Sequence, residues 1–140
     1  MTLDMLTIPE RYRDCRSFSF GDGPELATEL AALVVSGRKT ATVSTPEEPD
    51  CSSVGEFWIV LDGDKRPVCV IETLELIPRR FGEVDAQFAF EEGEGDRSLA
   101  HWRESHERYY RRLGVFSPDM TLLCERFRLV EVLAPMDLTT

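Results

Sequence analysis

The sequence predicts an α+β fold, in which a small β-barrel or curled sheet carries helices at its ends. Segments with strand character outnumber segments with helix character, and two consecutive strands are joined by a tight hairpin. No G-x-G-x-x-G or G-x-x-x-x-G-K-[ST] pattern is present, so nothing indicates a dinucleotide or P-loop site. With 140 residues, 42% of them hydrophobic, the chain is expected to form a single domain over 1–140.

The first predicted helix covers 25–36, after an N-terminal segment, 1–20, that is expected to be irregular. Pro24 suits the first helical turn, and Gly37 follows where a C-terminal glycine is common. Apolar residues recur at i, i+4, i+7 and i+8, which is the spacing of one helix face. That face consists of Leu26, Leu30, Leu33 and Val34.

Strands are predicted at 42–44, 56–62 and 67–77, and the residues 62–64 between the last two have hairpin-turn composition. Glu72 is a carboxylate within the third of these strands, on a face that is otherwise apolar. Because a buried carboxylate must be paired or protonated, Glu72 is either a structural partner of a buried base or a pocket residue, and the structural role is favoured. The apolar residues expected on its face are Val68, Val70, Leu74 and Leu76.

The second half of the chain predicts a helix over 97–113 and a strand over 120–133. Between 81 and 90 the pattern fits a short helix or a turn-rich crossing. The acidic run 91–96 has the composition of a solvated loop, and its charges suit the positive end of the following helix dipole. Asp96 or Ser98 can cap that helix. One side of it is expected to carry Leu99, Trp102, His106, Tyr109 or Tyr110, and Leu113.

The formal net charge of −10 opposes non-specific attraction to a polyanion, so a double-stranded DNA partner is not expected. The charge is compatible with a small substrate that is uncharged or singly charged. No run of about 18 apolar residues indicates a membrane helix, and residues 1–13 lack a signal-peptide layout. We therefore expect no membrane partner and a cytoplasmic location.

Cysteine and histidine spacing predicts neither a disulfide framework nor a zinc site, and no metal ligands are assigned. The two histidines lie five residues apart and are expected to be surface or packing residues. The cysteines are Cys15, Cys51, Cys69 and Cys124, and the histidines are His101 and His106.

The segment 37–42, Gly-Arg-Lys-Thr-Ala-Thr, carries the chemistry that the sequence suggests. A lysine whose pKa is lowered by burial can accept a proton from a hydroxyl, and a threonine activated in this way can attack an acyl carbon. Lys39 and Thr42, three residues apart, are the candidate base and nucleophile. On these six residues alone, a polar turn before a strand remains the more economical interpretation.

Several blocks in a fixed order resemble the ASCH domain family of the PUA-like superfamily, in particular its larger bacterial members. The first block is the G-x-K-x-x-T signature at 37–42. The resemblance spans about 20–133. The later blocks are Gly55-Glu56-Phe57-Trp58, Cys69-Val70-Ile71-Glu72-Thr73, Phe88-Ala89, residues 91–96, Trp102-Arg103 with His106, and Leu123-Cys124-Glu125-Arg126-Phe127.

The resemblance implies a PUA-like small β-barrel with flanking helices around a cleft. One branch of the family consists of amidohydrolases that act on N4-acetylcytidine, which implies Thr42 as nucleophile, Lys39 as base and Glu92 as the assisting carboxylate. Glu91 and Glu94 compete with Glu92 for that last position. The substrate-binding residues expected around the cleft are Arg38, Glu94, Trp102 and Arg103.

Two alternatives remain open. In a ribonuclease acting on single-stranded RNA, Arg38, Lys39 and Arg103 would bind phosphate, while Trp102 or Tyr109 would stack on a base. A divalent metal is expected only in that case; otherwise no cofactor is predicted. The second alternative is a non-catalytic module that binds RNA or a modified nucleotide. The expected partner is thus a small nucleoside or single-stranded RNA, and Trp102 can equally be a core residue.

Overall fold

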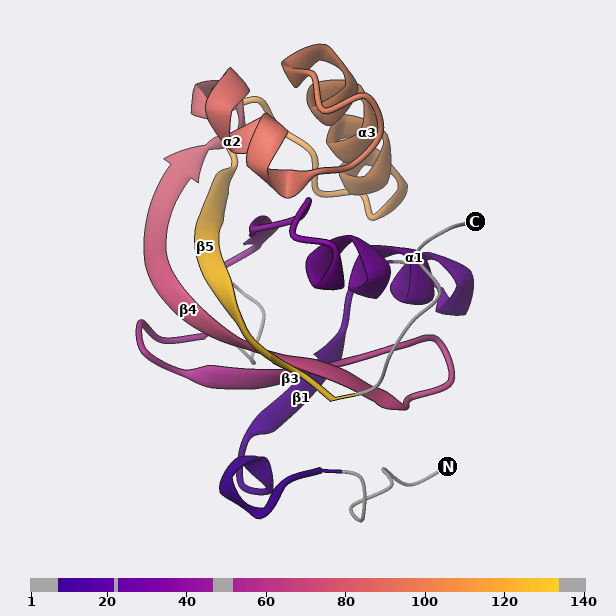
Figure 1. The fold of residues 1–140 in the computed structure, drawn as a ribbon. Helices are drawn as coiled ribbons and strands as arrows, with labels where there is room; N and C mark the ends of the chain where they lie inside the picture. Colours follow the sequence, from indigo (N-terminus) through magenta and orange to yellow (C-terminus); the bar gives the residue numbers. More distant parts are fainter. Residues whose placement is uncertain (1–7, 22, 47–51, 134–140) are drawn as a thin grey trace.

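A curled sheet of five strands forms the frame of the protein (Figure 1). The structure is a computed structural model, and it describes residues 8–21, 23–46 and 52–133. The strand order is β1-β3-β4-β5-β2, in which β1 runs parallel to β3 and the other neighbours are antiparallel. The predicted α+β class is confirmed, with the curled sheet open as a half-barrel. The strands are β1 (Arg16–Ser19), β2 (Ala41–Ser44), β3 (Phe57–Leu61), β4 (Pro67–Arg80) and β5 (Thr121–Val132).

Three α-helices accompany the sheet within the described part of the chain. Helix α1 (Pro24–Val35) lies within the curl, whereas α2 (Ala86–Glu92) and α3 (Leu99–Arg112) lie together beyond one end of β4 and β5 (Figure 1). Short 3-10 helices occur at Glu10–Tyr12 and Phe81–Glu83. Among the helices of the described ranges, none combines the length and the apolar character that crossing a membrane requires.

Separate apolar clusters fix α1 and the α2–α3 pair to the sheet. In the first, Leu30, Ala31 and Val34 of α1 pack against buried residues of β3, β4 and β5. In the second, residues of α2 and α3 pack against the β5 side chains Leu122 and Cys124. Burial of each large aliphatic side chain contributes about 1.5–3 kcal/mol, so both contacts hold their helices in place.

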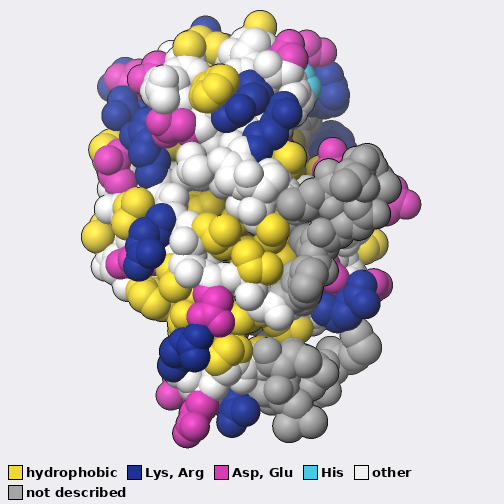
Figure 2. Space-filling model, in the orientation of Figure 1, with side chains coloured by type: hydrophobic (Ala, Val, Ile, Leu, Met, Phe, Trp, Pro, Cys, Tyr) yellow, Lys and Arg dark blue, Asp and Glu magenta, His cyan; other side chains and the backbone are white. Residues whose placement is uncertain are grey.

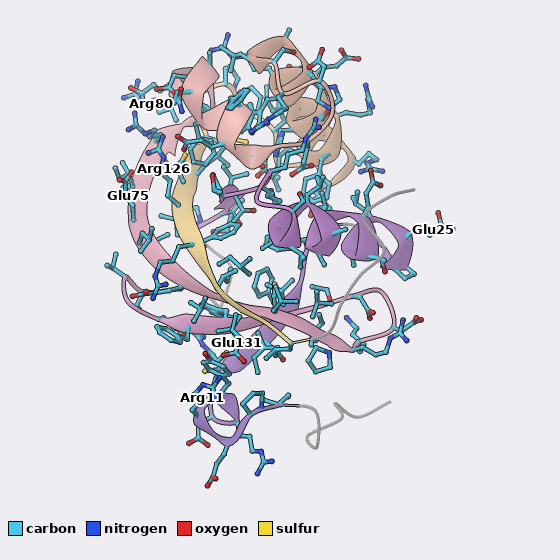
Figure 3. The ribbon with its side chains drawn as sticks, viewed as in Figure 1. Arg11, Glu25, Glu75, Arg80, Arg126 and Glu131 are labelled. Atoms are coloured by element: carbon cyan, nitrogen blue, oxygen red, sulfur yellow. The ribbon has the colours of Figure 1, made fainter. Side chains whose placement is uncertain are left out.

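Charged side chains form ion pairs along the long strands. Arg126 of β5 donates to Glu75 of β4 at 2.7 Å, and these two residues lie beside each other in Figure 3. Arg11 and Glu131, labelled in the same view, pair where the N-terminal segment meets the end of β5. On the face in Figure 2, acidic and basic side chains are interspersed, with apolar side chains gathered near its middle.

The predicted helices and strands are largely confirmed, with differences at β1 and at the end of β4. Residues 16–19 form β1, so the prediction of an irregular segment was wrong for that stretch. The strand has only four residues, and it pairs in parallel with β3, which is distant in sequence. Strand β4 continues to Arg80, beyond the predicted end at 77, because β5 pairs with it as far as that residue.

The prediction of a solvated loop over 91–96 was wrong for its first two residues. Glu91 and Glu92 form the last turn of α2, which Gly93 closes with a φ of 75°. Glu92 is only 1% exposed. A run of acids gave no indication of burial, because the buried partner of Glu92 comes from another part of the chain.

Glu72 has the structural role that was favoured. Its carboxylate accepts from Arg128 Nε at 2.6 Å, and that arginine is 52% exposed, so the partner is a surface base instead of a buried one. The apolar face predicted around Glu72 is interrupted, because a register shift between Thr73 and Glu75 leaves Leu74 49% exposed.

Helix α3 begins after Ser98, whose hydroxyl accepts from the His101 amide at 3.0 Å. Ser98, and not Asp96, is therefore the N-terminal cap. Leu113, expected on the packed side, is 57% exposed after the helix end. Cys15, Cys69 and Cys124 are free thiols, while Cys51 lies outside the described residues.

Candidate functional site

A cavity of about 490 Å³ opens between the end of β1, α1, β2 and α3. Aromatic side chains from β1, β3 and α3 form part of its wall, including Phe18, Trp58 and Tyr109. The chemically active groups around it come from four separate segments of the chain. They are Lys39, Thr42, Glu92, Glu94, His106 and Glu125.

The backbone after α1 turns Lys39 into the protein. Gly37 adopts a φ of 84°, and the amides of Arg38 and Lys39 then both donate to Leu33 O at 3.0 and 3.1 Å. The next amide, that of Thr40, donates to Glu91 O at 2.8 Å. This link ties the signature segment to α2, and Lys39 is left only 1% exposed.

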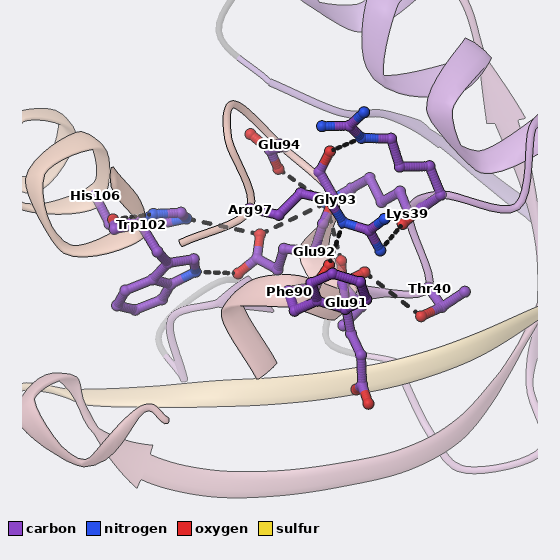
Figure 4. A network of polar contacts seen from close by, with 12 residues as sticks. Lys39, Thr40, Phe90, Glu91, Glu92, Gly93, Glu94, Arg97, Trp102 and His106 are labelled. Atoms are coloured by element: carbon purple, nitrogen blue, oxygen red, sulfur yellow. Dashed lines mark hydrogen bonds and ion pairs between the residues drawn. The ribbon is translucent and has the colours of Figure 1, made fainter. Parts of the chain in front are cut away.

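Three oxygen atoms surround the ammonium group of Lys39. Nζ donates to Ala41 O at 2.9 Å, to Glu92 O at 3.3 Å and to Glu94 Oε2 at 2.9 Å. A lysine needs all three of its protons to make three such bonds. Lys39 is therefore a protonated, fully engaged cation in this state (Figure 4).

Glu92 lies at the centre of the same network. Its Oε2 accepts from Trp102 Nε1 at 2.5 Å, and its Oε1 lies 3.5 Å from Lys39 Nζ and 3.8 Å from His106 Nε2. Burial raises the pKa of Glu92, and the charge of Lys39 offsets this only in part. For Glu94, burial also acts upward, but the charge and the hydrogen bond of Lys39 outweigh it, so the pKa of Glu94 is lowered.

His106 faces Glu92 with a defined ring nitrogen. Its Nδ1 lies 2.8 Å from Trp102 O, and because a carbonyl can only accept, Nδ1 must carry a proton. The other nitrogen, Nε2, is thus directed to Glu92 (Figure 4). The ring stacks on Trp102 at 4.2 Å between centroids. The sequence predicted a surface or packing role for His106. The ring does pack against Trp102, and it also lines the cavity.

Thr42 and Glu125 are opposite each other in the antiparallel pair of β2 and β5. Directly opposed residues point to the same face of a sheet, and both of these line the cavity. Burial raises the pKa of Glu125, while a hydrogen bond from Thr73 acts in the other direction. The sequence did not single out Glu125 as a site residue, although an acid beside apolar residues in a strand is a weak signal of this kind.

Glu91, Glu92 and Glu94 were the candidates for the assisting carboxylate, and their side chains lie in different places. Glu92 and Glu94 line the cavity and contact Lys39. Glu91 points elsewhere, since its carboxylate accepts from Arg126 Nε at 2.5 Å and from Gln87 at 2.8 Å.

Three residues predicted to bind substrate are not among those that line the cavity. Arg38 donates to Gly93 O and Gly95 O, both at 2.7 Å, and so holds the loop after α2. Arg103 donates to two backbone carbonyls at 3.2 and 3.4 Å. Trp102 is 3% exposed and supports Glu92, which agrees with its alternative interpretation as a core residue.

Histidine, cysteine and carboxylate side chains do not gather into a metal-binding group of three or more anywhere in the described ranges. The arrangement around Lys39 is an ion-paired cluster of one cation and two carboxylates, at a cavity that Thr42 also lines. Such a cluster can hold and transfer protons next to a bound ligand.

Comparison with known proteins connects this geometry to a family. The family model of the ASCH domain matches residues 16–131. No curated protein matches the chain. Among solved structures, an ASCH domain from Lactobacillus crispatus JV V101 has 31% identity and a TM-score of 0.77, with 87% of this chain and 83% of that chain covered.

Two further solved structures are similar. Protein EF3133 from Enterococcus faecalis V583 has 35% identity and a TM-score of 0.76, with 85% of this chain and 78% of that chain covered. A point mutant of the ZmASCH protein from Zymomonas mobilis has 12% identity and a TM-score of 0.52, with 89% and 76% covered. At that identity, the last similarity concerns the fold alone.

Proposed function

This chain belongs to the ASCH domain family, and from that premise we propose that it is a hydrolase that removes the acyl group from an acylated nucleoside such as N4-acetylcytidine. One observation carries the proposal. The hydroxyl-bearing Thr42 lines the same cavity as the buried Lys39–Glu92–Glu94 cluster. A nucleophile and a proton-transfer group are thus available to one ligand.

The cavity suits a nucleoside in size and in wall chemistry. Its volume of about 490 Å³ falls within the range of small-molecule sites, which is roughly 300–1,000 Å³. Phe18 and Tyr109 are aromatic wall residues that are only partly buried, so a base can stack on them. Arg38 and Arg103, which a phosphodiester substrate would need, are engaged with backbone carbonyls.

In the proposed reaction, Thr42 Oγ attacks the amide carbon of the acyl group, and the proton of the hydroxyl passes to Lys39 Nζ. The carbon–nitrogen bond then breaks, and the departing nitrogen takes a proton from Glu92. This step releases the free nucleoside and leaves an ester on Thr42. Water hydrolyses that ester, so the acyl group leaves as a carboxylic acid and the threonine hydroxyl is restored.

Lys39 must give up a proton before it can accept one from Thr42. Glu92 is the proposed recipient, because its Oε1 lies 3.5 Å from Nζ and burial raises its pKa. Transfer converts a buried ion pair into two neutral groups, an exchange that a low-dielectric environment favours. The same transfer leaves Glu92 protonated, as the leaving nitrogen requires.

The test is an assay of N4-acetylcytidine deacylation with wild type, Thr42→Val and Thr42→Ser. Valine has the shape of threonine without its hydroxyl, so turnover should fall by about 10³-fold or more, whereas serine should retain part of it. Thr121→Val, at the exposed start of β5, is the matched control and should leave turnover unchanged.

Single-stranded RNA is assayed in parallel, with and without divalent metal. Full activity of Thr42→Val would refute Thr42 as nucleophile. RNA cleavage without deacylation would favour a ribonuclease, and binding of N4-acetylcytidine without turnover would favour a binding module.

A further inference from the structure

The charges around the cavity are unevenly distributed. Three carboxyl groups line it, those of Glu92, Glu94 and Glu125. The buried cation, Lys39, already pairs with two of these carboxyl groups and donates to two backbone carbonyls. Arg112 also lines the cavity, but it is an exposed residue at the end of α3, where solvent screens its charge. The interior of the cavity therefore presents more hydrogen-bond acceptors than positive charges.

Glu125 stands apart from the Lys39 cluster and is held by a different set of groups. Thr73, which is fully buried, donates to Glu125 Oε2 at 2.6 Å. Thr73 also shares a hydrogen bond of 2.6 Å with Ser52, whose hydroxyl accepts from Trp58 Nε1 at 2.7 Å. This chain of hydrogen bonds fixes one oxygen of the carboxyl group and, through it, the direction of the other.

The second oxygen, Oε1 of Glu125, has no hydrogen-bond partner among the residues that the structure describes. No buried polar side-chain atom in the described ranges lacks a partner, so this oxygen is accessible to solvent, and Glu125 is one of the residues that line the cavity. A carboxyl oxygen that is held in place and left open toward a cavity is suited to accept a hydrogen bond from a ligand.

We propose that Glu125 is a specificity-determining residue of the cavity, which accepts a hydrogen bond from an N–H or O–H group of an uncharged nucleoside and disfavours the phosphorylated form. The inference deepens the proposed function and rests on it for the choice of ligand. A phosphate carries a charge of about −1.5 to −2 at neutral pH. In the cavity the phosphate meets carboxyl groups, among them Glu94, whose pKa is lowered, and no uncommitted buried cation among the described residues compensates.

The position of Glu125 opposite Thr42 places a ligand group bound by Glu125 close to the proposed nucleophile. A ligand group bound by Glu125 lies next to the strand position from which Thr42 reaches the cavity. A hydrogen bond at this place would set the orientation of the nucleoside relative to the hydroxyl. Glu125 thus acts on ligand choice and placement, while the proposed proton transfers remain with Lys39 and Glu92.

The test measures binding of cytidine and cytidine 5′-monophosphate by isothermal titration calorimetry, because neither ligand carries an acyl group that could react. Wild type should bind cytidine at least about tenfold more tightly than the monophosphate. Glu125→Gln should weaken cytidine binding by about tenfold or more, since a neutral amide is a poorer acceptor than a carboxylate. The variant should also have a smaller ratio of cytidine affinity to monophosphate affinity than wild type.

Glu72→Gln is the matched control, because Glu72 lies in the same sheet, pairs with Arg128 and does not line the cavity. It should leave both affinities unchanged. Equal or tighter binding of the monophosphate to wild type would overturn the proposal, and that comparison needs no variant. So would unchanged cytidine affinity in a folded Glu125→Gln protein, or failure of wild type to bind cytidine.

Deacylation of N4-acetylcytidine, measured separately, distinguishes this inference from the proposed function. Glu125-dependent binding of cytidine without turnover would support Glu125 as the specificity residue and remove the hydrolase assignment. If Glu125→Gln changed neither turnover nor binding, the hydrolase assignment would be supported and Glu125 would not be the specificity residue.

Discussion

Glu92 Oε1 lies 3.5 Å from Lys39 Nζ, and the side chains of both residues are at most 2% exposed. A pair buried to this degree loses nearly all of its hydration, and the attraction between the partners must compensate for that loss. The pair gains further support from Trp102, which donates to the other oxygen of Glu92. The site is therefore a part of the protein where removal of one partner should have large consequences.

Lys39→Met should destabilise the protein by about 3–5 kcal/mol at pH 8, because it leaves the carboxylate of Glu92 buried without its cation. The loss should be smaller at pH 5, where Glu92 can take up a proton instead. Urea unfolding at the two pH values measures both effects. Lys65→Met, at an exposed turn, is the control and should change stability by less than about 0.5 kcal/mol. A loss for Lys39→Met no larger than that of the control would contradict the importance of the pair.

The pH dependence of stability should carry a contribution from Glu92 with a definite sign. Burial raises the pKa of Glu92 in the folded state above its ordinary value of 4.5. The folded protein then binds this proton more tightly than the unfolded chain, so the contribution is fully present below pH 4.5 and is lost as the pH rises through the folded value.

Glu92→Gln should remove this contribution, so the stability of wild type minus that of the variant should fall as the pH is raised from 4 to 8, a range chosen around the ordinary pKa. Chemical denaturation of wild type and variant across that range measures this difference. A difference that stays level or rises with pH would show that Glu92 is not shifted upward.

The loop after α2 should depend on glycine at position 93 for two separable reasons. Gly93 and Gly114 have nearly the same φ, 75° and 74°, but a Cβ at Gly93 would overlap the Arg38 carbonyl, with its carbon 2.8 Å away, whereas one at Gly114 would meet nothing within 4 Å. Gly114→Ala should therefore show the conformational cost alone, about 1 kcal/mol. Gly93→Ala should exceed it by about 2 kcal/mol or more, because backbone atoms must move.

Urea midpoints of the two alanine variants provide this comparison. Gly93→Ala should also lower deacylation, since Arg38 and Gly93 together position the segment that carries Glu92 and Glu94. Equal midpoints for the two variants would show that the loop accommodates the added methyl group.

Local sequence patterns determined the elements that a short stretch can specify by itself. The apolar spacing of Leu26, Leu30 and Val34 set out α1, and Gly37 marked its end, as the structure confirms. The order of strands and helices then favoured a curled sheet with helices at its ends. Lys39 and Thr42 were recognised as a potential pair because they lie three residues apart in one segment.

Long-range contacts decided what the sequence could not. Strand β1 exists because β3 pairs with it, and the burial of Glu92 depends on Lys39 and Trp102, which lie 53 and 10 residues away. Glu125 faces Thr42 only through the register of β2 and β5. Register, burial and ion pairing are properties of segments brought together in folding, so tertiary structure alone could convert a lysine and a threonine in a loop into a defined cavity with three carboxyl groups.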